Sequence, residues 1–422
     1  MPRHAGFHAA AVPVALWLVF VAHTCSAGRP VREDMRVGEV TSPPTVQVGL
    51  GRCLRDPGVR IAVRGPYQVR GRAEVLASGD ELPWIAVRAS PEGIVVGRDA
   101  FRENPVTLVP ADSGTIEVEY LRDSRGHPTR ATAVRYPGTL LLHALPDQKL
   151  VLVNEVDLEE YLKGVVGKEM SLGEGVEALK TQVIAARTYA VHEQRLERLR
   201  RVKGEKFDLY DDERSQVYGG MERATELASR LVEETRGMFL VYEGTIVRTF
   251  YSSACGGHTE PAWEIMGDEG EKMPPLAGRA CEYCRRRPIY RWKEPVVVSK
   301  KEIADKCLPR ELQGAKVKSV EVTKSLPGGH AVEVTVALEN SSRLVRLHAN
   351  NDFRRNLTPS RFRSTLWEKI EDRGDSVAVF GRGFGHGVGM CQVGAYEMAK
   401  DGKTAAEILE YYFPAAKVQK LY

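Results

Sequence analysis

Hydrophobic residues recur at two different spacings along the chain. From residue 45 to 154, apolar and polar positions alternate in short runs separated by Gly, Pro, Asp and Ser, among them VQVGL, VRIAV, IAVRA and TLLLHAL. Alternation with a period of two, broken by turn residues, predicts β-strands. From residue 157 to about 236 the spacing becomes three or four, which predicts helices. We therefore expect a β-rich amino-terminal portion, acting as a scaffold or a binding module, followed by a helical region.

The helical region begins with a capping pattern. Asp157 is followed three residues later by Glu160, an arrangement in which an acceptor side chain starts a helix. One apolar stripe then follows at helical spacing, made by Leu158, Tyr161, Leu162, Val165 and Val166. Gly173 and Gly175 favour a break, after which a second stripe begins at Val176. We expect two helices joined by a short loop.

Glu169 lies at the end of the first stripe, three residues after Val166 and four after Val165. If the helix continues that far, the carboxylate joins the apolar face, where it must find a partner or keep its proton. Raising a glutamate pKa from about 4.3 to about 6 costs roughly 2 kcal/mol, and enzymes make a general acid in this way. The alternative is that Glu169 ends a short helix and points to water.

Beyond residue 236 short strands and helices alternate. Residues 238–253 predict a hairpin that turns at Glu243-Gly244, and residues 377–380 predict a last strand. A glycine-rich loop at 381–390 follows, then a helix from about Cys391 and a final helix over 404–412. The predicted fold class is therefore α+β: a β-rich amino-terminal portion, a central helical region around Glu169 and a mixed α/β carboxy-terminal portion.

The first 27 residues have the pattern of a signal peptide. An apolar run over 9–22 follows Arg3, and Cys25-Ser26-Ala27 offers a small-residue cleavage site. We assign 1–27 to this signal, 28–44 to a polar tether and 45–150 to the β-rich portion, and we expect an extracytoplasmic protein (periplasmic, cell-wall or secreted). The run is short for a spanning helix. An uncleaved anchor, the one expected route to the membrane, and a lipidated Cys25 are the alternatives.

Length and charge narrow the class of protein. The 422 residues suffice for two or three domains. The 60 basic and 56 acidic residues leave a net charge of only +4. This balance gives no indication of a nucleic-acid partner.

Cysteine spacing indicates a metal site or disulfides. Six cysteines lie beyond the signal, at 53, 255, 281, 284, 307 and 391. Cys255 and His258 form one close pair, and Cys281 and Cys284 form another. Four soft ligands in two pairs suit tetrahedral zinc, and a site filled entirely by protein is structural. In an oxidising compartment, a disulfide from Cys255 to one of the later pair is the alternative.

The glycine-rich loop displays His386. It has no register that gives GxGxxG and no lysine for a phosphate loop. Alternate glycines let the backbone approach another group closely, although a simple tight turn has the same composition. Cys255 or Cys391 paired with His386 or His258 would make a cysteine nucleophile.

Five segments occur in order over the second half: NEVDLEEYLKGVVGKEM, ALKTQVIAARTYA, SQVYGG, YSSACGGHTE and GRGFGHGVGMCQVGAYEMA. Together they resemble the SpoIID/LytB family, named for the stage II sporulation protein D. The resemblance covers residues 151–422, which it implies to be a catalytic region.

The resemblance implies a lytic transglycosylase that cleaves the β-1,4 bond between N-acetylmuramic acid and N-acetylglucosamine of peptide-stripped peptidoglycan. Glu169 corresponds to the family's catalytic acid. A single carboxylate suffices because the muramic C6 hydroxyl attacks its own anomeric carbon and forms a 1,6-anhydro ring, whereas ordinary glycosidases need two carboxylates. The carboxylate then takes the proton of that hydroxyl. No cofactor is required for this chemistry.

Other motif positions are implied to line or support the glycan groove: Gln182, Arg187, Thr188, Tyr189, Gln216, Tyr218, Ser252, His386, Gly387 and Gln392. Two departures from the family pattern stand out. Arg214 and Ser215 replace a His-Cys pair with which some members bind zinc, so that zinc site is not expected here. Cys391 and Val393 stand where Ser and Tyr are more frequent.

The expected partners are peptidoglycan glycan strands and other wall hydrolases such as an amidase. LytB-type members modify an amidase, so a non-catalytic, wall-binding regulator is the alternative function. A cysteine peptidase or amidase acting on wall peptides is the third.

Overall fold

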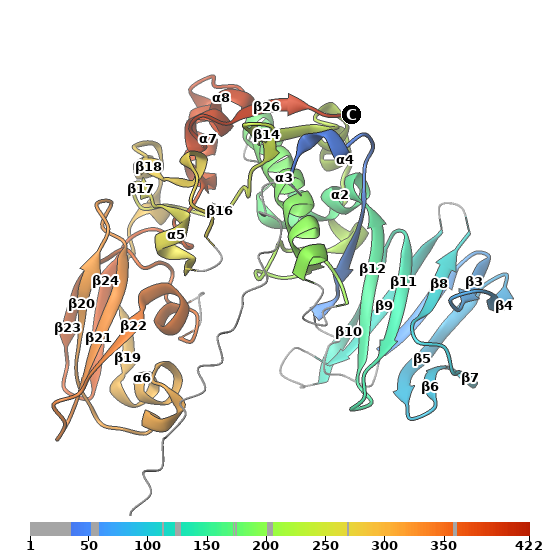
Figure 1. Cartoon of the computed structure of the whole chain (residues 1–422), viewed down its shortest axis with the longest axis horizontal. Coiled ribbons are helices and arrows are strands. Elements are labelled where there is room, and N and C mark those ends of the chain that lie inside the picture. Colours follow the sequence, from blue (N-terminus) through green and yellow to red (C-terminus); the bar gives the residue numbers. More distant parts are fainter. Residues whose placement is uncertain are drawn as a thin grey trace, which may run out of the picture.

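The computed structural model describes residues 35–51, 59–111, 114–122, 128–171, 173, 175–200, 206–267, 270–357 and 361–422. The predicted signal peptide, the first part of the predicted tether and Cys53 lie outside these ranges. Strands dominate the amino-terminal portion, helices the centre, and both are mixed in the rest (Figure 1). The predicted α+β class is confirmed.

The amino-terminal portion consists of two sheets. In spatial order, the seven-stranded sheet comprises β13 (Leu209–Tyr210), β1 (Thr45–Gly49), β12 (Leu150–Asp157), β11 (Thr139–Ala144), β8 (Val106–Pro110), β3 (Tyr67–Arg70) and β4 (Val75–Gly79). The six-stranded sheet comprises β10 (Pro128–Tyr136), β9 (Thr115–Arg122), β2 (Val59–Arg64), β5 (Leu82–Ser90), β6 (Gly93–Val96) and β7 (Asp99–Phe101). Neighbouring strands are antiparallel, except that β1 and β13 run parallel.

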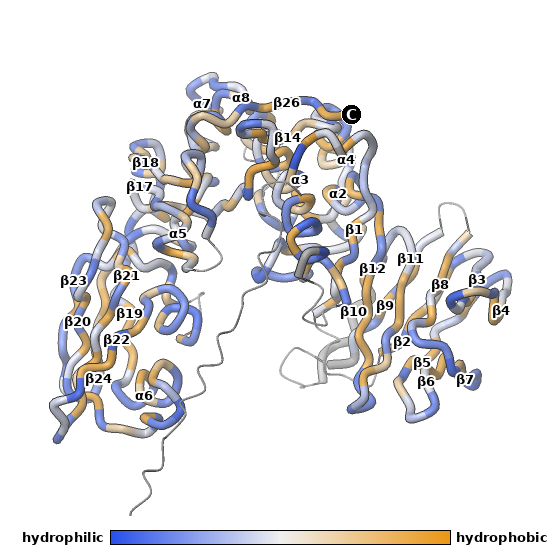
Figure 2. Tube along the Cα trace, in the orientation of Figure 1, coloured by the Kyte–Doolittle hydropathy of each residue, from blue (hydrophilic) through white to orange (hydrophobic). Residues whose placement is uncertain are grey.

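The alternating pattern buries one face of each strand. On β9, Ile116 and Val118 are fully buried, whereas Glu117 and Glu119 are partly exposed. Figure 2 shows the hydrophobic stretches along these strands and along the helices beside them. The two sheets share one hydrophobic core with those helices.

β12 connects this sandwich to the helices. It pairs with β1 on one side and β11 on the other, in the interior of the seven-stranded sheet. The boundary predicted after residue 150 therefore falls at the start of a strand that belongs to the sheet. Its last residue, Asp157, accepts hydrogen bonds from the backbone N–H groups of Glu159 (2.8 Å) and Glu160 (3.3 Å). The predicted cap is confirmed.

The central helices are α2 (Leu158–Glu169), α3 (Val176–Arg200) and α4 (Glu226–Glu234), with a 3-10 turn, η4 (Gly220–Arg223), before α4. The predicted stripe of α2 is buried throughout, and so is every residue of α3 from 181 to 194. α3 packs against α2, α4, the strand β14 and two carboxy-terminal helices, so it is the central helix of the fold. No helix in the described part of the chain is both long and apolar enough to cross a bilayer.

The predicted hairpin and the two last helices are present. β14 (Met238–Tyr242) and β15 (Thr245–Ile246) are joined through Glu243 and Gly244, whose φ angles of 47° and 73° suit a tight hairpin turn. The helices are α7 (Gln392–Lys400) and α8 (Ala405–Tyr412). An unpredicted strand, β26 (Lys417–Lys420), follows and pairs with β14.

Short elements fill the region between β15 and residue 292. They are β16 (Tyr251–Ser252), β17 (His258–Thr259), α5 (Ala262–Ile265), η6 (Pro274–Leu276), β18 (Arg279–Ala280), η7 (Tyr283–Arg286) and η8 (Pro288–Tyr290). A further 3-10 turn, η1 (Val37–Glu39), precedes β1. β16 pairs in parallel with β25 (Met390–Cys391), which directly precedes α7.

Residues 292–381 form a separate lobe with its own hydrophobic core (Figure 1, left). Its elements are β19 (Val296–Ser299), α6 (Lys300–Cys307), η9 (Arg310–Leu312), β20 (Val317–Ser325), β21 (Ala331–Leu338), β22 (Leu344–His348), a π-helical segment η10 (Ala349–Arg354), β23 (Trp367–Asp372) and β24 (Ser376–Gly381). They make two three-stranded sheets, in the orders β19-β24-β23 and β20-β21-β22. The chain leaves the lobe at the end of β24 and enters the glycine-rich loop. Residues of the region predicted as 151–422 thus contribute both to the core of this lobe and to the core shared with the amino-terminal sheets.

Candidate active site

Glu169 is the last residue of α2, and its carboxylate is covered by a distant segment. Glu169 Oε1 accepts a hydrogen bond of 2.6 Å from the backbone N–H of Val217. The two alternatives for Glu169, a carboxylate on the apolar face and a residue that ends the helix, therefore each hold in part. The helix ends at Glu169, yet the carboxylate is enclosed although the residue as a whole is partly exposed.

Burial raises the pKa of Glu169 to about 7. Hydrogen bonds from the Val217 N–H and from the Tyr251 hydroxyl act in the opposite direction, because they favour the ionised form. A carboxylate, Glu213, raises the pKa slightly further. None of the groups that shift this pKa is a cationic side chain of the described residues. Glu169 is consequently divided between acid and carboxylate near neutral pH, as a general acid–base group requires.

Gln216 organises the groups beside the carboxylate. Its Oε1 accepts from the Tyr161 hydroxyl (3.1 Å), and its Nε2 donates to the Tyr251 hydroxyl (2.9 Å) and to the Ala186 carbonyl (3.3 Å). The Tyr251 hydroxyl is thereby left to donate to Glu169. Gln216 thus supports the acid through Tyr251, which the motif positions had not singled out.

Gln392 connects the glycine-rich loop to the end of α2. Its Nε2 donates to the backbone carbonyl of Glu169 (3.2 Å) and to Gln182 Oε1 (3.1 Å). Two buried polar groups here have no protein hydrogen-bond partner among the described residues, Gln182 Nε2 and Ser252 Oγ. Buried polar groups are normally paired, but both atoms are closed off from solvent, so a ligand reaches them only if neighbouring side chains move apart.

The alternate glycines are needed because the loop runs against the backbone around β16. A Cβ at Gly389 would lie 2.0 Å from the Phe250 carbonyl oxygen, and one at Gly385 would lie 2.4 Å from Ser252 Cβ. Both glycines have positive φ angles, 68° and 117°. The expected close approach of the loop to another group is therefore an approach to this strand, and the loop is more than a turn.

His386 lies in that loop as a neutral ring. Its Nδ1 accepts from the Val388 N–H (3.0 Å), and the ring packs edge-on against Phe250. Burial lowers the pKa of His386 to about 3, against a hydrogen bond to the backbone of Tyr251. His386 is not among the groups that shift the pKa of Glu169.

Arg187, Tyr218 and Tyr189 are among the predicted groove residues that lie in the interior. Arg187 is fully buried and makes a bidentate ion pair with Glu159, at 2.9 and 2.7 Å. Tyr218 donates to Asn154 (3.0 Å), and Tyr189 packs against Phe250. The structure gives Arg187 a role in joining α3 to α2, and contact with glycan would require its guanidinium to leave Glu159.

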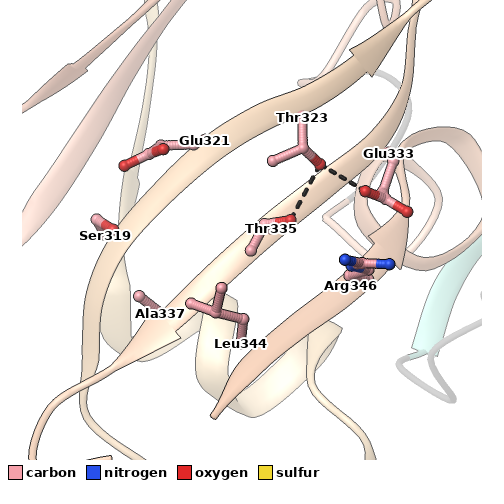
Figure 3. Close-up of a pocket in the computed structure, with 8 residues that line it drawn as sticks. All are labelled: Ser319, Glu321, Thr323, Glu333, Thr335, Ala337, Leu344 and Arg346. Atoms are coloured by element: carbon pink, nitrogen blue, oxygen red, sulfur yellow. Dashed lines mark hydrogen bonds between the residues drawn. The ribbon is translucent and has the colours of Figure 1, made fainter. Parts of the chain in front are cut away.

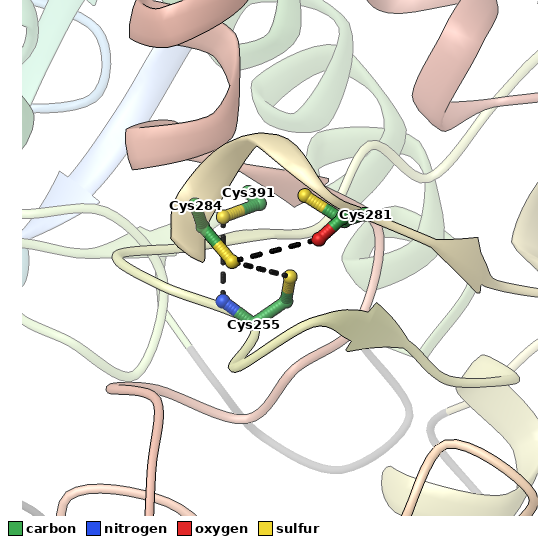
Figure 4. Close-up of side chains that lie close together, drawn as sticks. All are labelled: Cys255, Cys281, Cys284 and Cys391. Atoms are coloured by element: carbon green, nitrogen blue, oxygen red, sulfur yellow. Dashed lines mark hydrogen bonds between the residues drawn. The ribbon is translucent and has the colours of Figure 1, made fainter. Parts of the chain in front are cut away.

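The metal ligands expected from spacing are partly different in the structure. Cys255, Cys281, Cys284 and Cys391 form one buried group whose sulfurs all lie within 4.8 Å of one another (Figure 4). His258 does not belong to this group, and its Nδ1 lies 3.5 Å from Glu260 Oε2. Cys391 takes its place, because the pairing of β16 with β25 brings it beside Cys255.

The same burial disfavours a cysteine nucleophile. Cys255 and Cys391 are both fully buried. Burial raises the pKa of the Cys391 thiol well above its usual range, whereas a nucleophilic cysteine needs access and a lowered pKa.

Where some family members have the zinc-binding His-Cys pair, Arg214 forms an ion pair with Asp212, and the Ser215 hydroxyl accepts from the Tyr210 N–H.

A shallow groove of about 250 Å³ lies on the separate lobe (Figure 3). Its walls are alternate residues of β20, β21 and β22, among them Glu321, Thr335 and Arg346. It contains none of the predicted site residues, and its polar side chains face outward from a three-stranded sheet. The surroundings of Glu169, with its enclosed carboxylate, are therefore the candidate active site.

Comparison with known proteins identifies a family model and several relatives of this chain. The family model described as "Stage II sporulation protein" matches residues 146–242, which include Glu169, Gln182 and Gln216. The chain is 33% identical over 280 residues to an uncharacterised protein of Brachyspira hyodysenteriae, covering 66% of this chain and 71% of that protein.

Two relatives from Bacillus subtilis have names that describe a role. Stage II sporulation protein D is 31% identical over 280 residues, covering 64% of this chain and 76% of that protein. The amidase enhancer is 26% identical over 294 residues, covering 60% of this chain but only 39% of the enhancer. The matched lengths and identities leave one conclusion: the chain belongs to the stage II sporulation protein D (SpoIID) family.

Proposed function

We propose that the protein is a lytic transglycosylase that cleaves the β-1,4 bond between N-acetylmuramic acid and N-acetylglucosamine in peptidoglycan, with Glu169 as acid and then base. The observation that carries the proposal is the enclosed Glu169 carboxylate, whose pKa burial raises to about 7 without a cationic partner. At neutral pH such a group can both give and take a proton. The family relationship supports a role at the cell wall.

In the proposed reaction, protonated Glu169 gives its proton to the glycosidic oxygen as the bond to the muramic anomeric carbon breaks. The muramic C6 hydroxyl attacks that carbon and closes the 1,6-anhydro ring. The Glu169 carboxylate takes the hydroxyl proton, so the acid is restored and no water is consumed. Hydrogen bonds from the Val217 N–H and the Tyr251 hydroxyl stabilise the carboxylate between the two transfers.

This scheme needs one carboxylate, whereas a hydrolase needs a second one to activate water or to act as nucleophile. Glu213 is the carboxylate whose charge acts on Glu169, and it is exposed on the loop before Val217. We give it no role in the reaction. Product mass tests this assignment, because an anhydro end is lighter than a hydrolysed end by one water.

Sugar recognition is proposed for the unpaired groups near Glu169. Gln182 Nε2 and Ser252 Oγ are buried without protein partners among the described residues. Gln392 holds Gln182 in place through its own hydrogen bond to Gln182 Oε1. Hydroxyl and acetamido groups of the glycan are the proposed partners, with peptide-stripped strands as the substrate and an extracytoplasmic location.

The test is the Glu169→Gln variant incubated with peptide-stripped glycan, with products analysed by mass spectrometry. Loss of a general acid–base group typically costs 10²–10⁴-fold in rate, so release of anhydromuramic products should fall by at least about 10²-fold. Glu160→Gln, an exposed position on the same helix, is the matched control and should keep wild-type activity. Undiminished release by Glu169→Gln would exclude the assignment, and products with hydrolysed ends would point to a hydrolase.

A non-catalytic role is the second candidate, and the similarity to the amidase enhancer is the observation that favours it. In this case the protein binds the wall and acts through a partner amidase. Wild-type protein that binds glycan, releases no sugar and raises the rate of an amidase would establish this role in place of the first.

A further inference from the structure

Four cysteines from three separate segments meet in one buried group. Cys255 follows β16, and Cys391 is the residue before α7. Cys281 lies just before η7, and Cys284 lies within it. All four are fully buried. Their sulfurs all lie within 4.8 Å of one another, and the Cys255 and Cys284 sulfurs are 3.6 Å apart.

This arrangement has the dimensions of a single tetrahedral metal ion. With zinc–sulfur bonds of about 2.3 Å, tetrahedral geometry places the ligand sulfurs about 3.8 Å apart. Two disulfides would require two pairs at about 2.05 Å and would not require the pairs to converge. An iron–sulfur cluster binds its cysteines through different iron atoms, so it needs the four sulfurs spread more widely around it.

Backbone N–H groups and a tyrosine hydroxyl lie within hydrogen-bonding distance of the sulfurs. Cys391 Sγ accepts from the backbone N–H groups of Cys255 and Gly394, each at 3.3 Å. The Tyr412 hydroxyl lies 3.2 Å from Cys281 Sγ. Neutral thiol sulfur is a weak acceptor, whereas metal-bound thiolates are routinely supported by such donors. Cys391 also lies at the amino-terminal end of α7, where the helix dipole stabilises negative charge.

We propose that Cys255, Cys281, Cys284 and Cys391 bind one zinc ion as a structural tetrathiolate site. All four positions are filled by protein, so the ion has no open position for substrate or water. Through its bonds to the four cysteines, the ion would join three segments of the chain at one point.

The cysteine group is connected to the end of α2 through Gln392. Cys391 is followed directly by Gln392, whose side chain donates to the Glu169 carbonyl and to Gln182. The carbonyl of Cys255 accepts a hydrogen bond from His330 Nε2 (3.1 Å), so the lobe also contacts this point. The packing is close: a Cβ at Gly394 would lie 1.9 Å from the Tyr412 hydroxyl oxygen and 3.0 Å from Cys281 Sγ. The metal ion would position Gln392 without taking part in the reaction.

The first test is the metal content of the full chain, purified without chelator or metal resin, by elemental mass spectrometry. We expect one zinc ion per chain and none after Cys284→Ser. Cys307→Ser changes another buried cysteine, in the separate lobe, and should keep the ion. His258→Ala should keep it too, since His258 lies outside the group. Glu169→Gln should also retain full zinc, so this result is independent of the proposed function.

A variant that fails to fold would give no answer, so the wild-type protein provides a second measurement. Cobalt in place of zinc should give the intense visible absorption of a tetrahedral tetrathiolate. Chelation should lower the thermal unfolding temperature, and zinc should restore it. Metal-free protein whose intact mass shows disulfides, or metal-free protein with four titratable thiols after denaturation, would overturn the proposal. Zinc lost on His258→Ala but kept on Cys391→Ser would replace Cys391 by His258.

Discussion

Glu169 and Glu193 lie on neighbouring helices, and both carboxylates are enclosed, yet their pKa values move in opposite directions. Burial alone would raise both. Around Glu193 the guanidinium of Arg248, with contacts of 2.6 and 2.7 Å, and the ring of His192 outweigh burial and lower the pKa. Around Glu169 the partners are a backbone N–H and a tyrosine hydroxyl, and burial prevails.

The difference separates a carboxylate that stays ionised from one that can hold a proton near neutral pH. A buried carboxylate with a bidentate cation remains ionised and joins two segments, as Glu193 joins α3 to the chain after β15. A buried carboxylate with neutral donors keeps an accessible proton. The nature of the partner, rather than the degree of burial, decides which of these a glutamate becomes.

Replacing Arg248 should cost more stability than any change at Glu169. Arg248→Met leaves Glu193 enclosed, with His192 beside it but without the guanidinium. Breaking a buried ion pair by removing one partner typically costs about 3–5 kcal/mol, because a buried charge loses its compensation. We expect a loss of that size in the free energy of unfolding at pH 7, measured by chemical denaturation.

Arg230→Met is the matched control for Arg248→Met. Arg230 is 61% exposed and lies 3.6 Å from Glu234. Exposed pairs contribute at most about 1 kcal/mol, so this variant should be nearly neutral. A loss below about 1 kcal/mol for Arg248→Met would mean that the cation does not determine the state of Glu193.

The raised pKa of Glu169 should make the free energy of unfolding depend on pH. In the folded protein the pKa of Glu169 is about 7, above the ordinary 4.5. Between these values the folded state holds more protons than the unfolded state, so its stability falls as pH rises. Each pKa unit corresponds to about 1.36 kcal/mol, and partial solvent exposure reduces the total to roughly 1–3 kcal/mol.

Glu169→Gln should therefore be more stable than wild type at pH 8 by roughly 1–3 kcal/mol, with the difference shrinking towards pH 5. Chemical denaturation at both pH values measures it. Glu193→Gln should behave in the opposite way: the stability from its lowered pKa is present above about pH 4.5 and lost in acid. Wild type more stable than Glu169→Gln at pH 8 would contradict the raised pKa.

The local pattern predicted the helices around Glu169 but not the segment that encloses its carboxylate. The stripe of α2, the cap at Asp157 and the end of the helix follow from residues within a few positions of one another. The N–H that covers the carboxylate comes from Val217, 48 residues away. Spacing within one helix contains no information about such a contact, so the exposure of Glu169 remained open.

The cysteines and Arg187 show the same limit. The close pair Cys281 and Cys284 is visible in the sequence, whereas Cys391 is 136 residues from Cys255 and reaches it through the pairing of β16 with β25. Arg187 has the residue type of a groove ligand, but Glu159, 28 residues earlier, holds it in the core. A charge pattern does not distinguish an ion pair inside the fold from one awaiting a ligand.

The Tyr251 hydroxyl should make a smaller contribution than the Arg248 guanidinium. Tyr251 is the neutral counterpart of Arg248, since its hydroxyl donates to Glu169 and lowers that pKa. Tyr251→Phe removes this donor, so the pKa of Glu169 should rise further, by up to about one unit or about 1.4 kcal/mol. The alkaline limb of the pH–activity profile should shift upward by the same amount, with less than about a tenfold change in rate at pH 7.

Carbon-13 NMR titration of the glutamate carboxyl groups measures the shift without relying on activity. Tyr218→Phe is the control, because the Tyr218 hydroxyl donates to Asn154 rather than to Glu169. It should leave the titration of Glu169 in place. A downward shift in Tyr251→Phe would mean that the hydroxyl favours the protonated form, and the neutral donor could no longer be set against the cation at Glu193.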